Sequence, residues 1–280
     1  MRSPEPSPGT GATQGASARY ALGVVVLVAA IVSQYVVPWA WPASLVVYGN
    51  LAGDVAIVYG LPVVAFLVLV GVEPLRGWRR QARVATVEGL GWYGTMSLLA
   101  LGVTIVLGVV YELVDPGALA LLERPNPALE AAVGNPWFFV GFSFVIGAFE
   151  ETIFRGWVYG FWEGRTVPWT TPALLSSLLF AGVHIYYGTT YGAAAPLIFP
   201  SLFLLGVAFA ATFHASRGNL VVVALLHGAT DAAAYLTLVS YGAGLALHYG
   251  LVLVGALIAL VVYLQRSAAP RAPALPPPAW

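Results

Sequence analysis

Three apolar stretches of this chain contain acidic and histidine side chains that could do chemistry together. They contribute Glu150 and Glu151, then His184, then His227 and Asp231. An ionisable group inside hydrocarbon costs about 2.5–3.5 kcal/mol on insertion scales, so these residues are expected to pair with one another or to line a wet cavity. Carboxylates and imidazoles gathered in such a cavity can move protons to and from water or bind a metal ion.

Helical spacing assigns different tasks to the two glutamates. Glu151 and Arg155 are four residues apart, so they share one helix face and can form a structural ion pair. Glu150 lies about 100° further round the helix, where that arginine does not reach it. Burial disfavours the charged form of an unpaired carboxylate, which suits a general base at neutral pH. Glu150 is therefore predicted to be the base, and Glu151 to fix the helix or orient its neighbour.

The other two stretches follow the same helical logic. Phe180 lies one turn before His184 and is predicted to pack at the site, while His227 and Asp231 again share a face. Each motif alone is more often an interfacial charge or a hydrogen bond between helices. Their occurrence together in a chain with so few charges favours a site between three helices. Other ionisable residues near predicted span ends are interpreted as solvated or hydrogen-bonded interfacial groups, namely Asp54, Glu88, His214 and His248.

The composition places these motifs in a membrane. Of 280 residues, 59% are hydrophobic and only 9% are charged, and the mean hydropathy is +0.83, which excludes a soluble globular protein. The 12 basic and 12 acidic residues balance to a net charge of zero, so no charge excess indicates a nucleic-acid partner. The absence of cysteine excludes disulfides, thiolate metal ligands and a cysteine nucleophile.

Runs of roughly 20 apolar residues, the length that crosses a bilayer, define the expected architecture. We predict an all-α, polytopic membrane bundle with eight transmembrane helices, near 20–41, 53–72, 87–110, 137–161, 173–187, 197–213, 220–238 and 243–264. The membrane domain covers residues 20–265, and its motif-bearing core covers 137–241. The tails, 1–19 and 266–280, are rich in Pro, Ser, Gly or Ala and are predicted to be disordered.

Arginine placement supports an orientation with both termini in the cytoplasm. Every arginine except Arg124 then falls on the inner side, where positive charge is normally in excess. These inner arginines are Arg2, Arg19, Arg76, Arg79, Arg80, Arg83, Arg155, Arg165, Arg217, Arg266 and Arg271. The use of arginine without lysine, with abundant Ala, Gly and Val, favours a prokaryotic source. An integral, multi-pass protein of a prokaryotic plasma membrane is therefore expected.

At the three motifs the chain resembles the CPBP family of intramembrane proteases, which includes type II CAAX prenyl endopeptidases and bacteriocin-processing or self-immunity homologues. The family pattern is Glu-Glu-x-x-x-Arg, then Phe-x-x-x-His, then His-x-x-x-Asn or Asp. Here it is filled by Glu150 and Glu151 with Arg155, Phe180 with His184, and His227 with Asp231. The resemblance implies that Glu150 activates water with help from His184. It also implies that His227 and the residue at position 231 stabilise the oxyanion.

Asp231 departs from the asparagine that many prenyl endopeptidases have. An asparagine amide can donate to an oxyanion, whereas an ionised aspartate can only accept. Asp231 must therefore be protonated, orient His227, or ligate a metal. The last alternative would gather Glu150, His184, His227 and Asp231 around Zn²⁺ or another divalent metal that generates the nucleophile. The spacing lacks the one-turn histidine pair of ordinary zincins, and the sequence leaves metal dependence open.

The resemblance implies an intramembrane endopeptidase that hydrolyses a peptide bond. Its partners would be the lipid bilayer and a peptide or lipidated-peptide substrate at the inner membrane face. Two alternatives stay open at this point. The same side chains could form the relay of a proton- or cation-coupled transporter, or the chain could be a catalytically silent scaffold or immunity protein of the same fold.

Overall fold

The fold is a bundle of helices in the computed structural model, which describes residues 10–40, 55–75, 83–117, 132–162, 165–184 and 195–268. Within these ranges lie eight α-helices: α1 (Thr10–Ala40), α3 (Leu61–Leu69), α4 (Arg83–Val114), α6 (Pro136–Glu151), α7 (Thr170–Val183), α9 (Ala195–Ala215), α10 (Leu220–Val239) and α11 (Tyr241–Ala268). Two π-helices, η2 (Val55–Gly60) and η5 (Thr152–Tyr159), and the 3-10 turn η6 (Gly160–Trp162) adjoin them. The predicted all-α class is confirmed for this part of the chain.

Six helical segments of the described chain are long and apolar enough to cross a bilayer. They are Gly15–Ser33, Thr86–Val114, Pro136–Trp162, Pro196–Ala215, Leu220–Val239 and Tyr241–Gln265. Each coincides with one of the eight predicted spans. The six helices indicate an integral, multi-pass membrane protein, as the composition predicted.

The second and fifth predicted spans need correction. The apolar helices described there, Ile57–Leu69 and Thr170–Val183, belong to a shorter class of 10–17 residues. At 1.5 Å per residue such helices rise about 15–26 Å, which is less than the ~30 Å of hydrocarbon. One reason is visible after α3, where Gly71 takes a φ of 81° and stops the helix. The prediction of eight full spans is thus confirmed for six.

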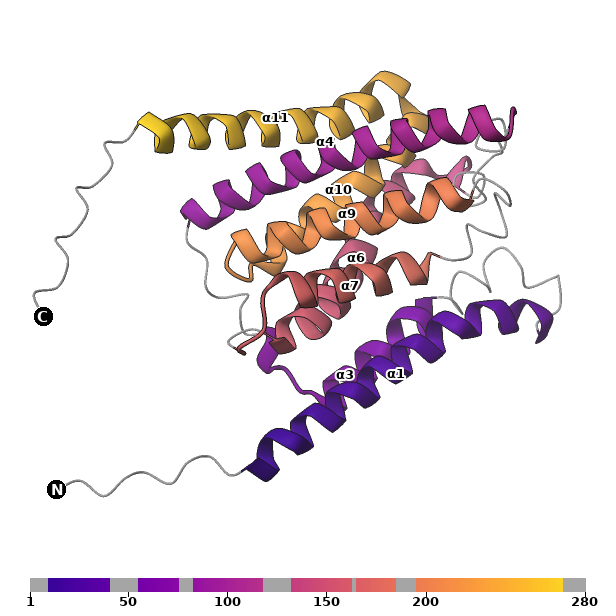
Figure 1. The fold of residues 1–280 in the computed structure, drawn as a ribbon. Coiled ribbons are helices and arrows are strands. Elements are labelled where there is room, and N and C mark those ends of the chain that lie inside the picture. The colour runs from indigo at the N-terminus through magenta and orange to yellow at the C-terminus, as the bar shows by residue number, and fades with distance from the viewer. Residues whose placement is uncertain are drawn as a thin grey trace, which may run out of the picture.

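The ends of the described chain bear on the predicted tails. α1 begins at Thr10, inside the predicted N-terminal tail, and α11 continues to Ala268. These two ends lie at the same end of the bundle (Figure 1). The rest of both tails lies outside the described residues, so the domain limits and the cytoplasmic location of the termini stay predictions. The arginines of the orientation argument that lie outside them are Arg2, Arg76, Arg79, Arg80, Arg124 and Arg271, and Asp54, which was interpreted as a solvated residue at a span end, also lies outside them.

The helices lie side by side in a layered order (Figure 1). α11 packs on α4, α4 on α9 and α9 on α7, while α10 packs against both α6 and α11. α1 packs against α3 at the other side of the bundle. The π-helix η5 contacts α3, α7, α9 and α10. The junction between α6 and η5 therefore lies among helices from both halves of the chain.

Two glycines let α6 and α10 approach closely. A Cβ atom at Gly147 would lie 2.8 Å from the backbone nitrogen of Gly228, and one at Gly228 would lie 2.7 Å from the Cα of Phe144. Small residues at helix contacts permit such backbone approach inside membranes, where no hydrophobic force drives helices together. Gly147 precedes the glutamates by one turn and Gly228 follows His227, so this contact brings the first and third motifs together.

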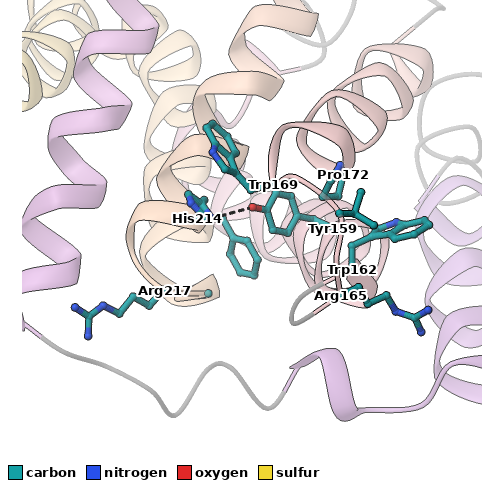
Figure 2. A pocket seen from close by; sticks show the side chains of 10 residues that line it. Tyr159, Trp162, Arg165, Trp169, Pro172, His214 and Arg217 are labelled. Atoms are coloured by element: carbon teal, nitrogen blue, oxygen red, sulfur yellow. Dashed lines mark hydrogen bonds between the residues drawn. The ribbon is translucent and has the colours of Figure 1, made fainter. Parts of the chain in front are cut away.

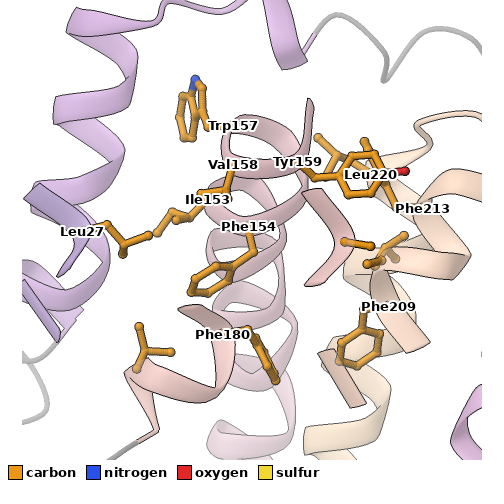
Figure 3. Close-up of a cluster of buried hydrophobic side chains, with 14 of the residues drawn as sticks. Leu27, Ile153, Phe154, Trp157, Val158, Tyr159, Phe180, Phe209, Phe213 and Leu220 are labelled. Carbon is orange, nitrogen blue, oxygen red and sulfur yellow. The ribbon is translucent and has the colours of Figure 1, made fainter. Parts of the chain in front are cut away.

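Aromatic side chains fill the core around η5 (Figure 3). Phe154 meets Phe180 of α7 edge to face at 5.6 Å, and Trp157 stacks on Phe66 of α3 at 5.7 Å between ring centroids. The Trp157 indole also donates to the carbonyl oxygen of Gly71 at 2.8 Å. These contacts fix the rotation of η5 and hence the direction in which the residues before it point.

Candidate active site

The two glutamates lie where α6 passes into the π-helix η5. α6 begins at Pro136, where the Asn135 side chain accepts a hydrogen bond from the backbone nitrogen of Phe138 at 3.3 Å. η5 continues the helix directly after Glu151, and its residues from Ile153 on are buried. π-helical turns are rare and are frequently found at functional sites. The backbone conformation therefore indicates a functional site at the same position as the acidic pair in the sequence.

Glu151 is the centre of a buried ion-pair network. Its Oε1 accepts hydrogen bonds from Arg155 Nη1 at 2.9 Å and from His227 Nδ1 at 2.7 Å. Arg155 Nη2 also donates to the carbonyl oxygen of Gly206 on α9 at 2.6 Å. The side chains of Glu151 and Arg155 are fully buried, so each charge depends on the other for neutralisation. The spacing predicted this ion pair, and the network links η5 to α9 and α10.

Glu150 lies beside this network in different surroundings. Tyr59 of η2 donates to its Oε1 at 2.5 Å. The Nε2 of His184 lies 4.0 Å from Oε1, and the Nε2 of His227 lies 3.7 Å from Oε2. Oε2 is buried and has no hydrogen-bond partner among the described residues. One carboxylate oxygen is therefore held by a phenol, and the other faces an imidazole without a protein donor.

Hydrogen-bond partners assign the tautomers of the two histidines. His184 Nδ1 donates to the carbonyl oxygen of Phe180 at 2.8 Å, since a carbonyl can only accept. His227 Nδ1 donates to Glu151, whose carboxylate is paired with Arg155 and also only accepts. Both rings therefore carry a proton on Nδ1 and turn Nε2 toward Glu150. Two imidazoles from α7 and α10 thus present the same atom to one carboxylate.

Asp231 and His184 lie on the more open side of the cluster. The Oδ2 of Asp231 is 3.5 Å from His227 Nε2, and its side chain is 36% exposed. The His184 side chain is 13% exposed, whereas that of Glu150 is only 2% exposed. These two side chains are therefore the most accessible of the acidic and histidine groups in the cluster.

Phenylalanine rings enclose the cluster on its apolar side. The Arg155 Cζ lies 5.1 Å from the ring centre of Phe180 and 5.4 Å from that of Phe209. The His227 ring stacks on Phe209 with centroids 4.6 Å apart and contacts Phe180 edge to face at 5.5 Å. Phe180 thus packs at the site, and these rings keep water away from the ion pair and restrict the motion of the imidazole.

The positions of the possible metal-binding side chains test the alternative of a metal site. No group of three His, Asp or Glu side chains within the described ranges is placed to hold a metal ion. The four residues considered for this role, Glu150, His184, His227 and Asp231, converge without forming such a group. No step of the mechanism below is therefore assigned to a metal.

The structure brings together the acidic and histidine residues that the sequence singled out, and it adds one. Tyr59 lies 91 positions before Glu150 and belongs to no motif. Tyrosines are frequent in this chain, so nothing in the local sequence distinguishes this one. Two residues set aside as interfacial lie elsewhere: His214 ends α9, and His248 lies on α11.

Comparison with known proteins supports the motif assignment. Residues 132–233 match the family model Type II CAAX prenyl endopeptidase Rce1-like. The matched segment contains all three motifs, and it confirms the resemblance over this part of the chain. Tyr59 lies outside it. No curated protein and no solved structure matches the chain.

Proposed function

We propose that this protein is an intramembrane endopeptidase that hydrolyses a peptide bond of a membrane-associated peptide or lipidated peptide. One observation carries the proposal: the buried carboxylate of Glu150 faces the Nε2 atoms of two histidines, and its Oε2 has no protein donor within the described residues. A buried carboxylate oxygen normally has a hydrogen-bond partner. Water is the natural donor here, because it is also the reactant in peptide hydrolysis. The family match over residues 132–233 supports the same chemistry.

Glu150 is the general base in this mechanism. A water molecule bound between Glu150 Oε2 and the imidazoles of His184 and His227 gives a proton to the carboxylate as its oxygen attacks the substrate carbonyl carbon. A C–O bond forms, and the carbonyl oxygen becomes an oxyanion. Glu150 then transfers the proton to the leaving nitrogen as the C–N bond breaks, which releases an amine and a carboxylic acid.

Glu151 and Arg155 act through His227 and do not touch the reacting atoms. The Nδ1 hydrogen bond to Glu151 holds the His227 ring with Nε2 toward the open side of the cluster. A protonated His227 can donate from Nε2 to the oxyanion, and the fixed ring needs no reorientation during the reaction. Glu151 and Arg155 are therefore positioning residues.

One substitution distinguishes a protonated Asp231 from one whose carboxylate is needed. Asp231→Asn keeps a hydrogen-bond donor and removes the negative charge. If Asp231 is a protonated donor to the oxyanion, cleavage stays within about tenfold, or ~1.4 kcal/mol, of the unaltered protein. If its carboxylate is needed to orient His227, cleavage falls by about 10²–10³, as for the loss of an oxyanion donor.

Purified protein in detergent, incubated with a library of prenylated and unmodified peptides and analysed by mass spectrometry, tests the function. Glu150→Gln is expected to lower cleavage by about 10²–10⁴ because it removes the base but keeps the shape. Glu73→Gln, the same change at an exposed glutamate, is the matched control and retains cleavage. Undiminished cleavage by Glu150→Gln would contradict the assignment of the base.

The same preparation distinguishes the two other functions. A transporter would give pH-gradient-dependent flux in proteoliposomes and no peptide products. A silent scaffold would give neither, and its phenotype in cells would survive Glu150→Gln. Elemental analysis of the purified protein, with cleavage measured before and after chelation, addresses metal dependence in the same experiment.

A further inference from the structure

A recess lies where η6, the start of α7 and the turn between α9 and α10 meet (Figure 2). It has a volume of about 480 Å³ and is lined by residues that include Tyr159, Arg165, Trp169, His214 and Arg217. We refer to it as the interfacial cleft. Its volume lies within the range of roughly 300–1,000 Å³ that is usual for small-molecule sites. It is separate from the cluster around Glu150, since none of the predicted catalytic residues lines it.

Ring contacts preform the floor of the interfacial cleft. The rings of Trp169 and His214 stack with centroids 4.6 Å apart and planes inclined by 8°. The Tyr159 hydroxyl is hydrogen-bonded to His214 Nδ1 at 3.1 Å. These three side chains come from η5, α9 and the segment before α7, and they point toward one another in Figure 2. The floor therefore exists without a ligand and offers polar atoms beside flat apolar surface.

Two arginines flank this floor, and none of the described residues that line the cleft is acidic. Arg165 is exposed, with its Cζ 3.9 Å from the ring centre of Phe161 and its Nε donating to the Phe161 carbonyl oxygen at 3.0 Å. Arg217 is also exposed and extends away from the ring cluster on the opposite side (Figure 2). In Figure 2 the two guanidinium groups extend outward on opposite sides of the ring cluster, so each side chain has to turn inward to reach a ligand on the floor.

The backbone at Arg217 supports a functional reason for the arginine. Its φ is 54°, in the left-handed region, and Gly218 follows with a φ of 80°. The backbone nitrogen of Gly218 donates to the carbonyl oxygen of Phe213 at 2.9 Å, which is the bond of a helix C-terminal motif whose first left-handed residue is usually glycine. A side chain with a Cβ atom is disfavoured there. Strained residues of this kind cluster at functional sites.

We propose that the interfacial cleft binds a phosphate-bearing anion, either the phosphodiester headgroup of an anionic lipid or a free phosphate ester. Guanidinium groups match phosphate oxygens in charge and geometry, and they also stack on aromatic faces such as those of this floor. A cationic ligand would be repelled by the two guanidinium groups. The sequence predicts that Arg165 and Arg217 lie at the cytoplasmic interface, where basic pockets meet anionic lipid headgroups.

Thermal unfolding of the full chain in neutral detergent tests the proposal, because a ligand that binds only the folded state raises the melting temperature in a saturable way. The probes are short-chain phosphatidylglycerol, short-chain phosphatidylcholine and glycerol phosphate, each at matched ionic strength. We expect saturation with phosphatidylglycerol and no saturable shift with phosphatidylcholine. Saturation by glycerol phosphate as well identifies a free phosphate ester as sufficient, whereas its absence identifies the lipid as the source.

Variants at both arginines and at a control arginine connect the response to the cleft. Arg217→Gly and Arg165→Gln are each expected to weaken phosphatidylglycerol binding at least about tenfold. Arg217→Lys keeps the charge and retains part of the affinity. Arg19→Gln removes an exposed arginine that does not line the cleft and leaves binding unchanged. Glycine suits the backbone at position 217, so loss of binding by Arg217→Gly is not a folding defect.

Three results would overturn the proposal. The first is the absence of a saturable shift with both of the anionic probes, phosphatidylglycerol and glycerol phosphate. The second is an equal shift with phosphatidylglycerol and phosphatidylcholine. The third is an equal loss of affinity in Arg19→Gln and Arg217→Gly, which would show a general effect of charge. None of these measurements depends on peptide cleavage, so the outcome is independent of the proposed protease activity.

Discussion

The buried cluster at the start of η5 and the interfacial cleft at its end hold their arginines in opposite surroundings. In the cluster, Arg155 is fully buried, pairs with Glu151 and donates to a backbone carbonyl. In the cleft, Arg217 is exposed and extends away from the ring cluster. A buried charge needs fixed partners because water cannot replace them, whereas an exposed charge is stabilised by solvent. Substitution of one charged residue in the cluster is therefore expected to destabilise the others, whereas substitution of one residue in the cleft should leave the others in place.

Removal of the buried arginine is expected to have the largest effect on stability. Arg155→Met leaves the Glu151 carboxylate buried without its cation, so the free energy of unfolding should fall by about 3–5 kcal/mol. Reversible unfolding in mixed micelles, followed by circular dichroism, measures the change. The double variant Arg155→Met/Glu151→Gln removes both charges and should recover part of the loss. A single variant as stable as the unaltered protein would show that the cluster does not depend on pairing.

The close contact between α6 and α10 gives the next largest effect. Gly228→Leu places a Cβ atom 2.7 Å from the Cα of Phe144, where the backbone has to move. Overpacking of this kind costs about 1–3 kcal/mol, and it should also separate His227 from Glu151 and lower cleavage. Gly250→Leu on α11 is the control, because a Cβ atom there meets no atom within 4 Å. Equal stability of the two variants would exclude a role for the glycine contact.

The tyrosine at Glu150 should have a smaller effect. Tyr59→Phe removes the hydrogen bond to Oε1, which is worth about 1 kcal/mol in a partly buried setting. If the bond positions the base, kcat/KM should fall about fivefold by the same energy. Tyr263→Phe, at a 67% exposed tyrosine of α11, is the control.

A double-mutant cycle decides whether Tyr59 acts through Glu150. Tyr59→Phe should have almost no further effect on cleavage in the Glu150→Gln background, because the group that it positions is already altered. Additive losses would instead indicate that Tyr59 acts elsewhere. The cycle also connects a residue outside the matched family segment to the proposed site.

The contrast between the two regions explains what the sequence could predict. Spacing within one helix gives the pair of Glu151 and Arg155, because residues four apart share a face. The hydrogen bond from His227 to Glu151 depends on how closely α6 and α10 approach, and no local pattern encodes that distance. Membrane spans were predictable from apolar length except at α3 and α7, where the described helices are shorter than a bilayer is thick.

The interfacial cleft was not predicted, because its parts look ordinary one at a time. His214 was interpreted as a hydrogen-bonded interfacial residue, and its bond to Tyr159 agrees with that interpretation. Arg217 was counted among the arginines that set the orientation, with no role in binding. The sequence Arg217-Gly218 gave one unused signal, since a helix that ends before glycine often has a left-handed residue nearby. Only the fold shows that the arginine itself occupies that position.

The smallest expected effect is an increase in stability, and it distinguishes the interfacial cleft from the buried cluster most clearly. Arg217→Gly relieves the left-handed backbone and should raise the free energy of unfolding by about 1 kcal/mol in the absence of anions. Arg217→Ala removes the same charge but keeps a Cβ atom, so it should give no such gain. If both variants have the same stability, the backbone at this position is not strained. A gain confined to glycine would mean that the cleft retains an arginine at a cost in stability, whereas the buried cluster needs its arginine in order to be stable. Only the arginine of the cleft would then require a ligand to account for its presence.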